Sequence, residues 1–171
     1  YHDHIKLYFN DISKIPLSVA EEITDIVAIQ SQQGRRAKEI FNELRERFPS
    51  LLESKAKMIA RTEVSRTHTS IVESRSLDLD LNWYRWMATK GGRTRDSHRN
   101  MEGVLINWRD PPSPEELIGE KSYGAYHAGG IFNCRCEPIP LIDLDEVSWP
   151  HKVYKNGGII TLTRREFEKI M

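Results

Sequence analysis

The chain has 171 residues, of which 39% are hydrophobic and 29% charged, and its 25 basic side chains balance 25 acidic ones. This size suits one domain, with or without a helical arm, and no apolar run is long enough to cross a bilayer. A net charge of zero gives no overall attraction to nucleic acid, and two cysteines exclude a disulfide framework.

The first half of the chain predicts three helices. Ser18 begins a capping box and Gly34 ends the helix that follows it. Residues 35–48 form a second helix, and Ser50 caps a third one over residues 51–77. If it is unbroken, the third helix is roughly 38 Å long and forms the spine of the fold.

The second half predicts short strands and long loops. Pro138 and Pro140 interrupt one extended segment, which indicates an edge strand, and Thr163 with Glu166 forms a capping box. The predicted elements are strands over 81–88 and 104–108, a polar loop over 89–103, a long loop over 110–130, an extended segment over 131–142, and a last strand and short helix over 157–170.

These elements predict an α+β fold: an N-terminal helical half with one long helix, followed by a small mixed, mostly antiparallel sheet with long loops. The predicted divisions are a helical arm (1–50), a central domain (51–147), and a C-terminal strand with a short helix (148–171). Residue 1 is Tyr rather than Met, so we expect a part of a longer protein.

The two cysteines are one residue apart, in the stretch NCRC. On a strand both thiols would point to one face, and two thiolates make half of a tetrahedral zinc site. His98 is the first candidate for a further ligand to Cys134 and Cys136, His127 is the second, and Asp96 is a weaker one. The alternative is a pair of free thiols that pack as small hydrophobic groups.

A Cys–His nucleophile pair is another alternative, with a thiol attacking and His98 or His127 as the base. No residue that would orient the base stands out, and no substrate pocket can be read from the sequence. We therefore expect no enzymatic activity.

The stretch ARTEVSRTH on the long helix predicts a polar network. Glu63 and Arg66 are three residues apart and thus neighbours, and Glu63 lies beside the apolar stripe of the helix. A surface ion pair is the alternative. The predicted network, which would hold the polar loop onto the helix, consists of Arg61, Thr62, Glu63, Arg66, Arg93 and Arg95.

Two further groups of side chains are less informative. Trp83 and Trp86 are three residues apart, so on a strand they face opposite ways, and core packing explains them better than base stacking. His2 and His4 lie near the start of the chain and are expected to be exposed.

The order of the motifs ARTEVSR, WYRW, RTRDSHRNMEG, a proline-rich loop and NCRC resembles the phage Mu F-like minor head proteins, also called phage head morphogenesis proteins. The resemblance covers residues 51–145. The matching positions are Arg61, Thr62, Glu63 and Arg66 in the helix motif, Arg93, Arg95, His98 and Gly103 in the central loop, and Asn133, Cys134, Arg135 and Cys136 in the last motif. Ile131 and Phe132 replace a His-Pro pair of the family, which removes one candidate ligand.

The resemblance implies a structural minor capsid protein of a tailed phage or prophage, acting at the portal vertex in head assembly and in DNA packaging or ejection. Its implied partners are portal and capsid proteins and, in some members, DNA, but no membrane. Its implied location is the virion, in the capsid interior or at the portal vertex, and the bacterial host cytoplasm during assembly. Zinc at His98, Cys134 and Cys136 is the one candidate cofactor, and a domain without a metal is the alternative. The alternatives are a metal-dependent hydrolase or toxin-like effector domain, and a DNA-binding module that uses the basic stretches 35–66 and 85–109.

Overall fold

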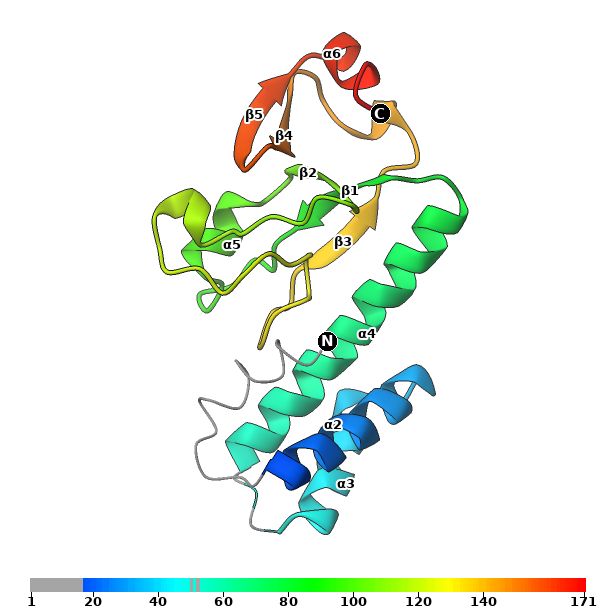
Figure 1. Ribbon diagram of the computed structural model, residues 1–171, viewed down its shortest axis with the longest axis vertical. Coiled ribbons are helices and arrows are strands. Elements are labelled where there is room, and N and C mark those ends of the chain that lie inside the picture. Colours follow the sequence, from blue (N-terminus) through cyan, green and yellow to red (C-terminus); the bar gives the residue numbers. More distant parts are fainter. Residues whose placement is uncertain (1–16, 50, 52) are drawn as a thin grey trace. The chain divides into compact units, whose positions relative to one another are not determined.

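The computed structural model describes residues 17–49, 51 and 53–171, and it separates the chain into two compact units, residues 1–67 and 68–171 (Figure 1). Among the described residues, no helix combines the length and apolar character of a membrane span. The helices are α2 (Leu17–Gln32), α3 (Ala37–Arg47), α4 (Glu53–Asp78), α5 (Asp96–Asn100) and α6 (Arg164–Glu168), with short 3-10 helices η1 (Glu116–Ile118) and η2 (Leu144–Glu146). The strands are β1 (Trp83–Met87), β2 (Leu105–Asn107), β3 (Glu137–Pro140), β4 (His151–Lys155) and β5 (Gly158–Leu162).

Among its described residues, the first unit contains α2, α3 and the first part of α4. Ile23 and Val27, four residues apart on α2, are fully buried because this spacing places them on one helix face. Gly34 ends α2 in the left-handed conformation, with φ of 77°, as the sequence predicts. Ser18 lies inside α2 rather than ahead of it, and Ser50 lies outside the described residues.

The second unit contains a five-stranded sheet with the order β3-β1-β2-β4-β5. The pair β2–β4 is parallel, with Leu105 opposite Val153, and the other three pairs are antiparallel. The predicted α+β class, with a helical first half and a mixed, mostly antiparallel sheet, is therefore confirmed. The segment with Pro138 and Pro140 is an edge strand, also as predicted.

One strand was not predicted. β4 pairs with β5 as a hairpin, and the turn between them is formed by Asn156 and Gly157, with φ of 53° and 78°. Two successive positive φ values are the mark of a type I′ turn, for which Asn-Gly is a preferred sequence. The dipeptide was thus a readable hairpin signal that the analysis of single strands overlooked.

The two faces of the sheet carry separate hydrophobic clusters. Trp83 belongs to one cluster, together with Leu105, Val153 and Phe167, while Trp86 belongs to the other, as its position three residues later predicts. The second cluster also contains Tyr84, Met101, Ile106, Trp108, Tyr126, Cys134 and Cys136. Both tryptophans therefore serve in core packing.

The predicted polar loop 89–103 contains a short helix, α5. The helix is followed by Gly103, with φ of 77°, whose backbone N–H donates to the carbonyl of Trp86 at 2.9 Å. This contact returns the chain to the sheet, and β2 begins two residues later. The loop therefore has a fixed geometry, and it places His98 in the last turn of α5.

Candidate metal centre

The predicted metal ligands His98, Cys134 and Cys136 lie together in the second unit. Nδ1 of His98 lies 3.5 Å from Sγ of Cys134 and 3.4 Å from Sγ of Cys136. The three ligand atoms all lie within 4.8 Å of one another, and no other group of this kind occurs among the described residues. Each residue is only 2–3% exposed. One imidazole and two thiolates form a donor set typical of zinc.

Helix α5 and the sheet hold His98 in place. The imidazole lies edge-on to the ring of Trp86 on β1, with the ring centroids 5.7 Å apart. Ser97 and His98 are buried, whereas their neighbours Asp96 and Arg99 are exposed and form an ion pair with each other. The short helix therefore turns Ser97 and His98 inward and leaves Asp96 and Arg99 in solvent.

The cysteines do not lie on a strand, contrary to the prediction. They precede β3, in a turn in which the backbone N–H of Cys134 donates to the carbonyl of Ile131 at 3.1 Å. Asn133 takes the left-handed conformation with φ of 54°, which Asn tolerates better than most residues. The backbone N–H of Cys136 then donates to Sγ of Cys134 at 3.4 Å. The turn, rather than strand alternation, brings the two sulfurs to one side.

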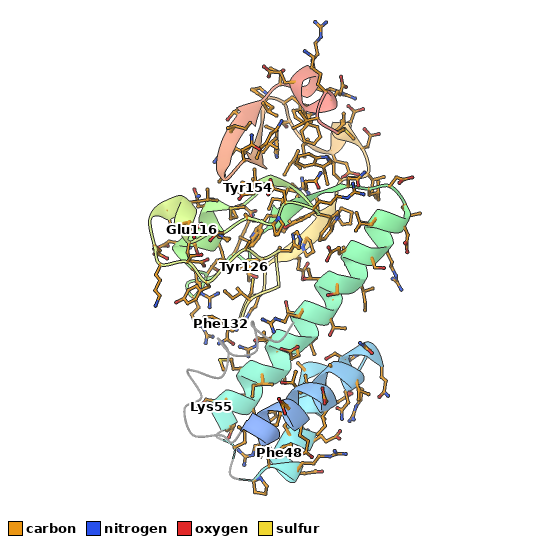
Figure 2. All side chains as sticks on the ribbon, viewed as in Figure 1. Phe48, Lys55, Glu116, Tyr126, Phe132 and Tyr154 are labelled. Atoms are coloured by element: carbon orange, nitrogen blue, oxygen red, sulfur yellow. The ribbon has the colours of Figure 1, made fainter. Side chains whose placement is uncertain are left out.

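A chain of hydrogen bonds continues behind His98. The hydroxyl of Tyr126, which is labelled in Figure 2, donates to both carboxylate oxygens of Glu115, at 2.6 and 2.8 Å. Because this uses the only hydroxyl hydrogen of Tyr126, its oxygen accepts from Nε2–H of His98, 3.1 Å away. Ser97 also donates to Glu115, at 3.1 Å. His98 thus engages Tyr126 through Nε2 and turns Nδ1 towards the two sulfurs.

The two thiols differ in their acidity. The hydrogen bond from Cys136 lowers the pKa of Cys134, against the effect of burial. The pKa of Cys136 is raised, because its hydrogen is shared with Cys134 and because it is buried. The indole of Trp86 and the backbone N–H of Thr89 act in the opposite direction on Cys136. The hydrogen bond between the two thiols therefore makes Cys134 the more acidic of the pair.

His127, the second candidate ligand, does not belong to this cluster. Its Nδ1 lies 3.1 Å from the hydroxyl of Tyr84, and its ring is edge-on to that of Trp108 at 5.2 Å. Burial lowers the pKa of His127 to about 4, so the side chain is neutral at pH 7. His2 and His4 lie outside the described residues.

The residues of the predicted polar network occupy varied environments. Arg66 donates to Glu63 at 3.2 Å, and the pKa of Glu63 is nevertheless raised, because burial outweighs the attraction of Arg66. The hydroxyl of Thr62 donates to the carbonyl of Met58 at 2.8 Å. Arg61 is half-buried in α4.

The two arginines of the polar loop differ. Arg93 is exposed, whereas Arg95 is half-buried, donates to the carbonyl of Phe132 at 3.0 Å and lies 4.5 Å above its ring. Arg95 therefore braces the turn that precedes Cys134. An interaction of Arg93 and Arg95 with the ARTEVSR motif of the long helix stays a prediction.

The motifs that carry this site belong to a known protein family. The sequence model of the family described as "Phage Mu protein F like protein" matches residues 21–139. The chain belongs to this family. The resemblance to phage head morphogenesis proteins that the sequence predicts is thus confirmed.

A protein of Haemophilus influenzae described as uncharacterized is 27% identical to this chain over 114 residues. The match covers 67% of this chain but only 22% of that relative. No solved structure matches the chain.

The family match includes all three residues of the cluster and ends on β3. The residues beyond it form β4, β5 and α6, although β4 pairs with β2 inside the same sheet. The segment after the match is therefore part of the second unit's fold.

Two residues of the site were missed by the sequence analysis, Tyr126 and Glu115. Both lie in the long loop between β2 and β3, and Glu115 is only 1% exposed. Acidic side chains in proline-rich loops are usually exposed, so nothing in the local sequence signals this burial. The available signal was His98 itself. A His that binds a metal usually donates its other N–H to a polar group, so such a group could have been sought once His98 was chosen.

Proposed function

We propose that this chain is a structural minor component of the head of a tailed phage or prophage, acting at the portal vertex during head assembly. The observation that carries the proposal is the family match over residues 21–139. The partners are portal and capsid proteins, and the location is the virion and, during assembly, the host cell. The match covers only 22% of the relative from Haemophilus influenzae. The role of a complete protein of that length is therefore proposed here and not shown by the match.

The burial of the histidine–cysteine cluster supports a structural role over the hydrolase alternative. His98, Cys134 and Cys136 are 2–3% exposed, and the Nε2 of His98 is already engaged by Tyr126. A metal-dependent hydrolase needs a coordination position that a substrate can reach. Side chains so deeply covered are better suited to holding the fold together.

Ion pairs in the first basic stretch favour a protein partner over DNA. Several arginines between residues 35 and 66 are engaged by carboxylates of the same unit, which lowers their ability to neutralise phosphates. The pairs are Arg35–Glu43 at 2.7 Å, Arg47–Glu43 at 3.2 Å, Arg66–Glu63 at 3.2 Å and Arg45–Glu53 at 3.4 Å.

The main experiment is the analysis of phage heads. The chain's gene is deleted from the phage or prophage that encodes it, and particles are purified from both strains. We expect the protein in wild-type heads at a copy number far below that of the major capsid protein, cross-linking to the portal protein, and fewer DNA-filled heads after deletion. Absence from purified heads, together with a normal yield of filled particles after deletion, would refute the proposal.

DNA binding is tested separately by gel retardation of duplex DNA at low and moderate salt. Binding through many phosphate contacts would fall steeply as the salt concentration rises. We expect no retention by the purified chain even at low salt. Retention that is lost steeply with salt would revive the DNA-binding alternative.

A further inference from the structure

We propose that His98, Cys134 and Cys136 bind one zinc ion, and that Tyr126 and Glu115 are positioning residues that hold His98 in the tautomer that binds it. This site is independent of the role in phage heads proposed above.

The distances fit coordination to a shared ion. With Zn–S of about 2.3 Å, Zn–N of about 2.05 Å and tetrahedral angles, a coordinated nitrogen and sulfur lie about 3.5–3.6 Å apart. Nδ1 of His98 lies 3.5 and 3.4 Å from the two sulfurs. A hydrogen bond to Nδ1 would favour one sulfur, because the nitrogen has a single hydrogen or lone pair in the ring plane. Nearly equal distances to both sulfurs are what an ion between the three atoms produces.

The hydrogen bonds behind His98 are those of a metal ligand. Histidines that bind metals usually donate the other ring N–H to a polar group, which fixes the tautomer and raises the basicity of the ligating nitrogen. Here Nε2–H donates to Tyr126, and Tyr126 donates to Glu115. Glu115 is 1% exposed, and a carboxylate is expensive to bury without a partner of opposite charge. A cation bound at Nδ1 would provide that charge through the chain of hydrogen bonds.

A backbone N–H group donates to one of the two sulfurs. The backbone N–H of Cys136 donates to Sγ of Cys134 at 3.4 Å. The indole N–H of Trp86, whose ring lies 5.7 Å from that of His98, is buried without a hydrogen-bond partner. The N–H donor at Cys134 suits a sulfur with an accessible lone pair, as a metal thiolate has, and two buried thiolates would require a cation.

Zinc would join parts of the second unit that are distant in sequence. His98 is 36 residues from Cys134 and 38 from Cys136, so the ion would close the long segment between α5 and β3. A metal that binds only the folded state adds its binding free energy to folding.

The test uses the purified chain of 171 residues, without a metal-binding tag and under reducing conditions. Zinc is measured by elemental analysis, and the apoprotein is titrated with Co²⁺ while thiolate-to-cobalt charge-transfer absorption is recorded. We expect about one zinc per chain, a charge-transfer band that saturates at one equivalent, and a lower melting temperature with a chelator. Protein without zinc that gives no cobalt band would overturn the proposal.

Variants assign the ligands. We expect His98→Asn and the double variant Cys134→Ser/Cys136→Ser to lose the cobalt band, while His98→Cys keeps it, because Cys is also a zinc ligand. His127→Asn is the matched control, a histidine of the same unit outside the cluster, and should keep full zinc content. Undiminished zinc in the double cysteine variant would place the metal elsewhere and refute the site.

Tyr126→Phe tests the positioning role. It removes the hydroxyl but keeps the ring, and we expect zinc affinity to fall about 10–100-fold, measured by competition with a chromophoric chelator. Urea unfolding of the zinc-free proteins separates this effect from a loss of stability. An unchanged zinc affinity would remove Tyr126 and Glu115 from the proposal.

Discussion

Replacing Phe167 by alanine tests whether the last segment of the chain is part of the core. Phe167 on α6 is fully buried, and its ring lies 4.8 Å from that of Trp83 on β1 and 5.2 Å from that of Trp149. Removing a buried Phe side chain costs about 3–5 kcal/mol, from lost hydrophobic burial and the cavity left behind. Since whole domains are stable by about 5–15 kcal/mol, Phe167→Ala should remove a large part of the total.

The assay is urea unfolding followed by tryptophan fluorescence, because Trp83 and Trp149 both contact the mutated ring. With a slope of about 2 kcal/mol per molar urea, the midpoint should fall by about 2 M. Ile160→Ala on β5 is the control, since this side chain is 41% exposed, and it should cost less than about 1 kcal/mol. Equal small effects of both variants would show that residues after the family match do not stabilise the sheet.

Three further changes test other parts of the second unit. Thr69 donates to the buried carbonyl of Ala128 at 2.7 Å, so Thr69→Val should cost about 1–3 kcal/mol in urea unfolding, and Thr69→Ser, which keeps the hydroxyl, should cost less. The pKa of His127 is lowered to about 4 from an ordinary 6.5, so the unfolded chain takes up this proton first, and stability present above pH 6.5 is lost as the pH falls towards 4. His127→Gln should make unfolding free energies at pH 7 and pH 5 differ less than in the wild type, and an equal difference would contradict this. Gly157 has φ of 78°, so Gly157→Ala should lower the melting temperature by an amount worth about 1 kcal/mol, whereas Gly91→Ala, with nothing within 4 Å, should leave it unchanged.

The fold class could be predicted from the sequence because its strongest patterns are local. Apolar spacing and Gly34 marked the first helix, and the prolines of β3 marked an edge strand. The strand β4 was missed because its five residues of mixed polarity carry little signal by themselves, and because the Asn156-Gly157 turn after it was not used. Its place beside β2 is a parallel contact between distant segments, which no local pattern encodes.

The candidate site was predictable in its residue types but not in its geometry. His98, Cys134 and Cys136 were chosen for their chemistry, and they do lie together. The prediction that strand alternation aligns the thiols was wrong, because a turn at Asn133 does this instead. Glu115 was missed because its burial depends on Tyr126 and Ser97, whose positions follow from tertiary packing rather than from spacing.

The prolines of β3 also determine where the sheet can grow. The backbone N–H of Leu141 donates inward to the carbonyl of Trp83, and amide directions alternate along a strand, so the N–H groups of residues 138 and 140 would point outward. Both positions are proline, which has no N–H to offer. A strand from another molecule therefore finds no donors at these two places on the β3 border. Recruitment of a further strand by this sheet, whether in assembly or in aggregation, is directed to the opposite border at β5, whose five residues include no proline.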